Sequence, residues 1–207
     1  MLSLRVMGQE FFFHFSEGLT HITDINGYDH IVFLIALCAV YDFTQWKRVL
    51  LLVTAFTVGH SLTLFCAGMD WVVIPSHVAE FLIPCTILIT GLYNLRGVRD
   101  REHSRKRSTS SGRIKYFLAL FFGLIHGFGF SNYFRMIRAD ESESFVMDLL
   151  YFNLGVEAGQ ILIVLALLLI ASFAMSLFKF KQNAWNLFSS GIAVGISIIL
   201  IIDTWIF

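Results

Sequence analysis

Residues 148–176 have the sequence DLLYFNLGVEAGQILIVLALLLIASFAMS, which decides the class of fold. An α-helix that crosses a bilayer needs about 20 mostly apolar residues, and this stretch is longer. Glu157 interrupts its first half, although a carboxylate in hydrocarbon costs at least a few kcal/mol unless it is paired, hydrated or bound to an ion. The same segment therefore predicts a membrane helix and a polar site inside the membrane.

The rest of the chain has the same apolar character. Of its 207 residues, 57% are hydrophobic, 22 are phenylalanine and only two are proline, which is not the composition of a soluble globular domain. The apolar runs predict an all-α, polytopic membrane protein with about six transmembrane helices in a single domain, residues 1–207. The predicted spans are residues 28–44, 47–68, 73–95, 114–137, 148–176 and 186–207.

Basic residues gather on one side of these spans. Twelve of the 15 lysines and arginines fall in or beside the connections that follow the first, third and fifth spans. Because cytoplasmic loops are enriched in lysine and arginine, we expect residues 96–113 to form a cytoplasmic basic loop. Both termini then lie outside, and the protein resides in the inner membrane of the cell. The formal net charge is zero, so the composition does not point to nucleic acid as a partner.

The residues before the first span are amphipathic. Within residues 9–25, apolar side chains recur at helical spacing, and the other face carries His14, Glu17, His21 and Asp24. The pattern predicts that residues 1–27 are an external segment whose helix lies at the outer surface of the membrane. Its polar face is either simply solvated or collects metal ions, and the residues alone leave both explanations open.

Ionisable side chains on five predicted spans fall in one layer. With a rise of about 1.5 Å per residue, each of them lies in the outer half of the membrane. The predicted metal ligands are Asp29, His30, His60, Glu80, His126 and Glu157, together with His21 from the external segment. Asn153 and Gln160 lie on the helical face of Glu157 and are predicted to orient it. Imidazole and carboxylate form a ligand set for divalent transition ions such as nickel, cobalt or zinc.

Three functions fit these residues. The first is a divalent-metal transporter, which is passive because no nucleotide-binding motif such as GxxxxGKS is present. The second is an intramembrane zinc-type hydrolase with Glu157 or Glu80 as base, although the chain has no HExxH or GxSxG motif. The third is a metal sensor or assembly factor whose basic loop contacts a cytoplasmic partner. Taken singly, each membrane histidine is also explained by a hydrogen bond between helices.

Four motifs resemble those of the HupE/UreJ family. They are GLTHITDINGYDHIVFL from Gly18, AFTVGHSLTL from Ala55, FGLIHGFGF from Phe122 and FNLGVEAGQ, which ends at Gln160. The resemblance implies a bacterial membrane permease for nickel or cobalt that supplies hydrogenase or urease. It also implies a cytoplasmic metalloenzyme-maturation partner, and it leaves a homo-oligomer open.

The chain departs from the family pattern in two places. The family has a histidine five residues before its DH pair, whereas seven residues separate His21 from Asp29. The later family motif is FHGxxHGxE. In this chain Phe122 stands at the position of its first histidine, and Gly129 stands at the position of its glutamate. We expect Glu157 to supply the missing carboxylate. The departures weaken the assignment of nickel as the metal more than they weaken the expectation that a metal binds.

Overall fold

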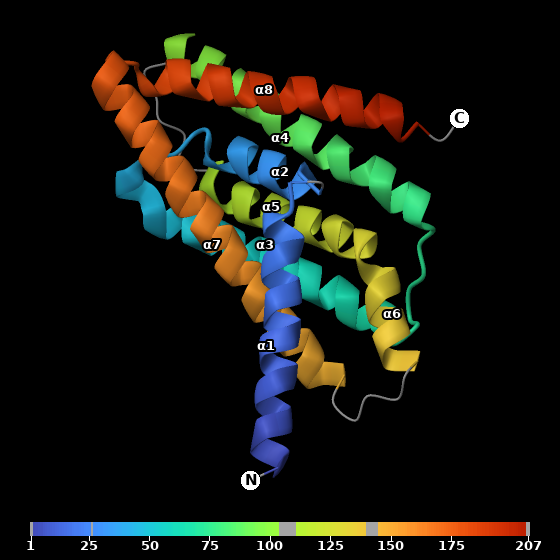
Figure 1. Ribbon diagram of the computed structural model, residues 1–207. Helices are drawn as coiled ribbons and strands as arrows, with labels where there is room; N and C mark the ends of the chain where they lie inside the picture. The colour runs from blue at the N-terminus through green and yellow to red at the C-terminus, as the bar shows by residue number, and fades with distance from the viewer. Residues whose placement is uncertain (1, 26, 104–110, 140–144, 206–207) are drawn as a thin grey trace.

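Helices make up most of the chain that the computed structural model describes, which is residues 2–25, 27–103, 111–139 and 145–205 (Figure 1). In chain order they are α1 (Leu2–Thr23), α2 (Asp29–Cys38), the short 3-10 helix η1 (Phe43–Gln45), α3 (Trp46–Gly68), α4 (Ser76–His103), α5 (Ser111–Gly129), α6 (Ser131–Ala139), α7 (Phe145–Phe178) and α8 (Gln182–Asp203). No strand occurs among the described residues, so the predicted all-α class is confirmed.

Four helical segments are long and apolar enough to cross a membrane. They are Phe43–Gly68, Ser76–Val98, Phe145–Phe178 and Gln182–Asp203, and they correspond to the second, third, fifth and sixth predicted spans. Large apolar side chains such as Leu51, Leu169 and Ile199 are exposed on them, which suits contact with lipid rather than water. The count of six spans stays a prediction.

The first predicted span is a shorter helix than expected. α2 has ten residues, which is about 15 Å of helix and about half of the hydrocarbon thickness. Other helices cap its carboxyl end. Asn94 Nδ2 of α4 donates to the carbonyl of Ala36 at 2.7 Å, and Gln182 Nε2 of α8 donates to that of Ala39 at 3.1 Å. Because unpaired carbonyls are costly in an apolar interior, these amides allow α2 to end inside the bundle.

The fourth predicted span, residues 114–137, is divided at Phe130 into α5 and α6. Gly127 and Gly129 weaken the helix just before the break, and Ser131 Oγ donates to the carbonyl of Phe128 at 2.8 Å.

The predicted basic loop is partly helical, because α4 continues to His103 and α5 begins at Ser111. Residues 104–110 of that loop lie outside the described residues, as do residues 206–207 of the sixth predicted span.

The N-terminal helix is bound to α7. Figure 1 shows α1 running across the direction of α4, α5 and α8, with its first turns projecting from the bundle. A Cβ added to Gly18 would lie 2.0 Å from the carbonyl oxygen of Phe152, and one added to Gly155 would lie 2.1 Å from that of Phe15. Backbones this close leave no room for a side chain at either glycine. The predicted position of this helix at the membrane surface stays a prediction.

α3 and α5 are joined in the same way. A Cβ added to Gly59 would lie 2.1 Å from the carbonyl oxygen of Leu120, and one added to Gly123 would lie 2.1 Å from that of Phe56. His60 directly follows the first of these glycines, and His126 lies three residues after the second. The close contact of the two helices therefore brings both histidines to one level of the bundle.

Candidate functional site

Four imidazoles meet where α1, α2, α3 and α5 come together. His21 lies in the last turn of α1, His30 in the first turn of α2, His60 on α3 and His126 in the last turn of α5. His30 is central, because its ring centroid lies 4.7 Å from that of His21, 6.3 Å from that of His60 and 5.1 Å from that of His126. Together with Asp29, we call these four histidines the histidine cluster.

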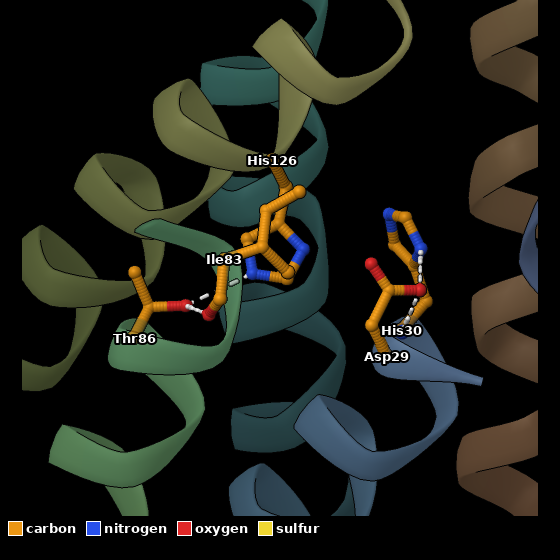
Figure 2. A network of polar contacts seen from close by, with 5 residues as sticks. All are labelled: Asp29, His30, Ile83, Thr86 and His126. Carbon is orange, nitrogen blue, oxygen red and sulfur yellow. Dashed lines mark hydrogen bonds and ion pairs between the residues drawn. The ribbon is translucent and has the colours of Figure 1, made fainter. Parts of the chain in front are cut away.

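A threonine of α4 sets the tautomer of His126. Thr86 Oγ1 donates to the carbonyl of Ile83 at 2.7 Å, because a carbonyl oxygen only accepts. In the 2.9 Å contact between Thr86 Oγ1 and His126 Nε2, the ring N–H is then the donor. The lone pair is left on His126 Nδ1, which is buried without a hydrogen-bond partner. Figure 2 shows Thr86 on one side of this ring and Asp29 and His30 on the other.

Asp29 orients His30 by the same principle. The carboxylate Oδ1 accepts the backbone N–H of His30 at 2.9 Å and lies 3.2 Å from its Nδ1. Because an ionised carboxylate only accepts, Nδ1 carries the ring proton and Nε2 has the lone pair. Nε2 is buried and has no hydrogen-bond partner. A carboxylate that holds one ring nitrogen while the other is free is typical of histidine metal ligands.

His60 and His21 complete the cluster. His60 is 0% exposed, and neither of its ring nitrogens has a hydrogen-bond partner among the described residues. His21 Nε2 is likewise buried without a partner. Burial, which penalises the charged imidazolium, lowers the pKa of His21 to about 3; this residue lies on α1, outside the segments long enough to span the membrane. Its imidazole is therefore neutral at pH 7 and keeps a lone pair.

Aromatic rings enclose the cluster. The ring of Phe130 lies 4.2 Å from that of His21, and the rings of Phe33 and Phe56 lie 5.2 and 5.0 Å from that of His126. Such a wall limits the access of water and lowers the local dielectric, which strengthens the binding of an ion by its ligands.

The free lone pairs suit a divalent transition ion. One ligand atom from each of His21, His30 and His60 lies within 4.8 Å of the others, and the same holds for Asp29, His30 and His126. Donors that lie about 2.0–2.1 Å from one ion are at most about 4.2 Å apart, so closing on an ion takes movements of less than about 1 Å. A buried polar atom without a partner is costly, and a single ion would satisfy several of these nitrogens.

Glu157 lies outside the histidine cluster, although it was predicted as a ligand. The face of α7 that is turned inward carries Phe152 and Val156, both 0% exposed, and Glu157 is the next position around the helix. Its Oε1 accepts a hydrogen bond from Thr54 of α3 at 2.7 Å. Both side chains line a groove of about 250 Å³ between α3 and α7.

The two residues predicted to orient Glu157 have other partners. Asn153 lies beside His60, and its Nδ2 donates to the carbonyl of Leu149 at 2.7 Å. Gln160 accepts a hydrogen bond from Thr57 at 2.8 Å. Of the two, only Asn153 is placed to support the histidine cluster.

Glu80 also lies outside the cluster. It is exposed on α4, whereas the buried face of that helix carries Ala79, Ile83 and Thr86. The helix therefore presents the hydroxyl of Thr86, and not the predicted carboxylate, to the site.

Comparison with known proteins decides the family. The family model described as HupE / UreJ protein matches residues 1–207, which is the whole chain. The chain belongs to the HupE/UreJ family. No curated protein and no solved structure matches it. Family membership and the four long apolar helices support a metal-related role in a multi-pass membrane protein.

Two features of this HupE/UreJ protein were not predicted. Thr86 carries the hydrogen bond to His126. Its position two residues after Pro84 gives no signal for this role, because its hydroxyl donates to the carbonyl of Ile83 and not to the carbonyl of Glu80, which Pro84 leaves without an N–H partner. The enclosing phenylalanines could not be singled out either, because 22 occur in the chain.

Proposed function

We propose that this HupE/UreJ protein transports a divalent transition-metal ion of the nickel or cobalt type, and that the histidine cluster holds the ion on its way. One observation carries the proposal. His21, His30, His60 and His126 all have buried ring nitrogens without hydrogen-bond partners, although buried polar atoms are normally paired. In histidines that served only to join helices, these nitrogens would form hydrogen bonds to one another or to backbone carbonyls.

The proposed topology has six spans, with residues 96–113 in the cytoplasm and both termini outside the inner membrane. α2 (Asp29–Cys38) then begins within the membrane at Asp29 and His30 and runs toward the cytoplasmic side. Helices that are interrupted at an ion site near the middle of the bilayer are usual in transporters. The short length of α2 therefore supports a transport site at its amino end.

A cavity offers a route from the cluster toward the cytoplasm. It has a volume of about 40 Å³ and lies between α2, α4 and α5. Phe33 lines this cavity, and its ring also lies 5.2 Å from that of His126. Thr90, Asn94 and Lys115 contribute polar groups to the wall. Movement of Phe33 would connect the cluster to this cavity.

The zinc-hydrolase alternative has weaker support. A general base has to lie within hydrogen-bond reach of the water that it activates. Glu157 and Glu80, the two carboxylates considered for that role, lie outside the histidine cluster. Asp29 is in the cluster, but its Oδ1 already accepts from His30.

Uptake of radioactive nickel into proteoliposomes that contain the full-length protein tests the proposal. We expect His60→Ala and His126→Ala each to weaken nickel binding by at least about tenfold and to reduce uptake at low nickel concentrations. His77→Ala removes an exposed histidine of α4 and is the matched control, with unchanged uptake. Wild-type uptake by both cluster variants would refute the proposal, and cobalt and zinc in the same assay would rank the ions.

A further inference from the structure

A second buried histidine–carboxylate pair lies between α1 and α7. His14 is 8% exposed, and Asp148, in the first turn of α7, is 4% exposed. His14 Nε2 lies 3.4 Å from Asp148 Oδ1, and His14 Nδ1 is buried without a hydrogen-bond partner. Neither residue belongs to the histidine cluster.

The distance between the two atoms fits an ion pair, and it also fits shared coordination of one metal ion. An N–H···O hydrogen bond in a protein is about 2.7–3.2 Å long, and the observed separation of 3.4 Å exceeds this range. Two ligand atoms that each lie about 2.0–2.1 Å from one tetrahedral ion are about 3.3–3.4 Å apart. The pair is therefore spaced like two ligands of one ion.

α1 and α7 carry this pair and the cluster at successive levels. His14 and His21 are seven residues apart, so they share a face of α1 and are separated by about 10 Å along it. On α7, Asp148 lies one turn before Phe152, whose ring is 5.8 Å from that of His21 and 5.1 Å from that of Phe130. A layer of aromatic rings thus separates the two levels.

Glu17 is half-buried and lies one turn after His14 on α1. Its carboxylate does not form a group of three close ligand atoms with His14 and Asp148 among the described residues. One imidazole and one carboxylate hold a nickel-type ion less tightly than several imidazoles do.

We propose that His14 and Asp148 form a second and weaker site for a divalent transition ion, from which the ion passes to the histidine cluster. The inference rests on the proposed transport function. A site on a transport route must bind well enough to capture the ion and weakly enough to release it, and a site with one imidazole meets both conditions. The rival explanation is that the pair only ties α1 to α7 as an ion pair.

A lysine at position 14 separates the two explanations. The ammonium of His14→Lys can pair with Asp148 and keep α1 attached, but it has no lone pair for a metal. Asp148→Asn preserves size and removes the anionic ligand. Glu10→Gln removes an exposed carboxylate of the same helix and is the matched control. Equilibrium dialysis of the full-length protein against radioactive nickel measures the number of ions bound, and the thermal midpoint reports folding.

We expect the wild type and Glu10→Gln to bind two nickel ions, one of them weakly. We expect His14→Lys and Asp148→Asn to bind one nickel ion each, and their thermal midpoints of unfolding to equal that of the wild type. Uptake by the two variants at low nickel concentrations should fall by about tenfold. The His60→Ala/His126→Ala double variant should keep the weaker ion. A single ion in the wild type, or two ions in a folded His14→Lys or Asp148→Asn variant, overturns this inference and leaves the transport proposal intact. No nickel bound to the wild type defeats both.

Discussion

Replacing Gly18 by alanine tests how strictly the position of α1 determines the metal site. The added Cβ would lie 2.0 Å from the carbonyl oxygen of Phe152 and 2.9 Å from the amide nitrogen of Val156. Since ordinary contact starts at 3.4 Å, the two helices must separate by about 1.4 Å at this point in a close-packed interface. Both atoms belong to the backbone, so no side-chain rotation relieves the contact, and overpacking of this kind costs about 1–3 kcal/mol.

The displacement reaches the histidine cluster because His21 lies three residues after Gly18. The ring of His21 is 4.7 Å from that of His30 and 5.9 Å from that of His60, so a shift of α1 moves one of the four imidazoles away from the others. We expect the nickel affinity to fall by about 10-fold to 100-fold, which is the range for a disturbed metal ligand.

Hydrogen exchange followed by mass spectrometry is the direct assay, because it reports the attachment of α1 independently of any metal. Gly18→Ala should speed the exchange of α1 amides, and a nickel titration should show the weaker affinity. Gly8→Ala makes the same change on the same helix where a Cβ meets nothing within 4 Å, and alanine favours helix there. If both variants matched the wild type in exchange and in affinity, the reasoning would be refuted.

Three further substitutions have distinct expected results. Thr86→Val removes the hydroxyl that accepts from His126 Nε2 and should weaken nickel binding by about tenfold. Thr90→Val is the control, because the Thr90 hydroxyl bonds within α4, and it should leave nickel binding unchanged. Equal nickel affinities of the two variants would contradict the role of Thr86. Asn94→Leu leaves a carbonyl at the end of α2 unpaired and should cost about 1–3 kcal/mol of stability, seen as a lower thermal midpoint in detergent. Glu157→Gln should leave the nickel content of the purified protein unchanged, because this side chain bonds to α3 outside the cluster; loss of nickel would restore it as a ligand.

Sequence patterns located the long helices but not the true length of α2. A run of apolar residues predicts that a segment lies in the membrane, and residues 28–44 met that condition. Where the helix ends depends on Asn94 and Gln182, which reach its carbonyls from α4 and α8. Such a cap comes from residues far away in the sequence, so the apolar pattern of the segment itself does not contain it.

The sequence predicted which histidines take part in the candidate site better than it predicted which way the carboxylates face. Counting residues along a helix placed His60, His126 and Glu157 in one layer; the structure brings each of the two histidines beside His30, while Glu157 bonds to α3. Each residue turns about 100° around the helix axis, so an estimate of depth leaves the facing side undetermined. The hydroxyl of Thr86 meets His126 instead of any predicted carboxylate on α4.

Residue type and order alone determined that this chain is a helical membrane protein of the HupE/UreJ family with ionisable groups in its apolar segments. They do so because apolar length and the cost of a buried charge are properties of each segment by itself. Which imidazoles face one another was decided only by the tertiary structure. Backbone contacts at Gly18 and Gly59 set how closely α1 meets α7 and α3 meets α5, and that approach joins His21, His30 and His60 into one group.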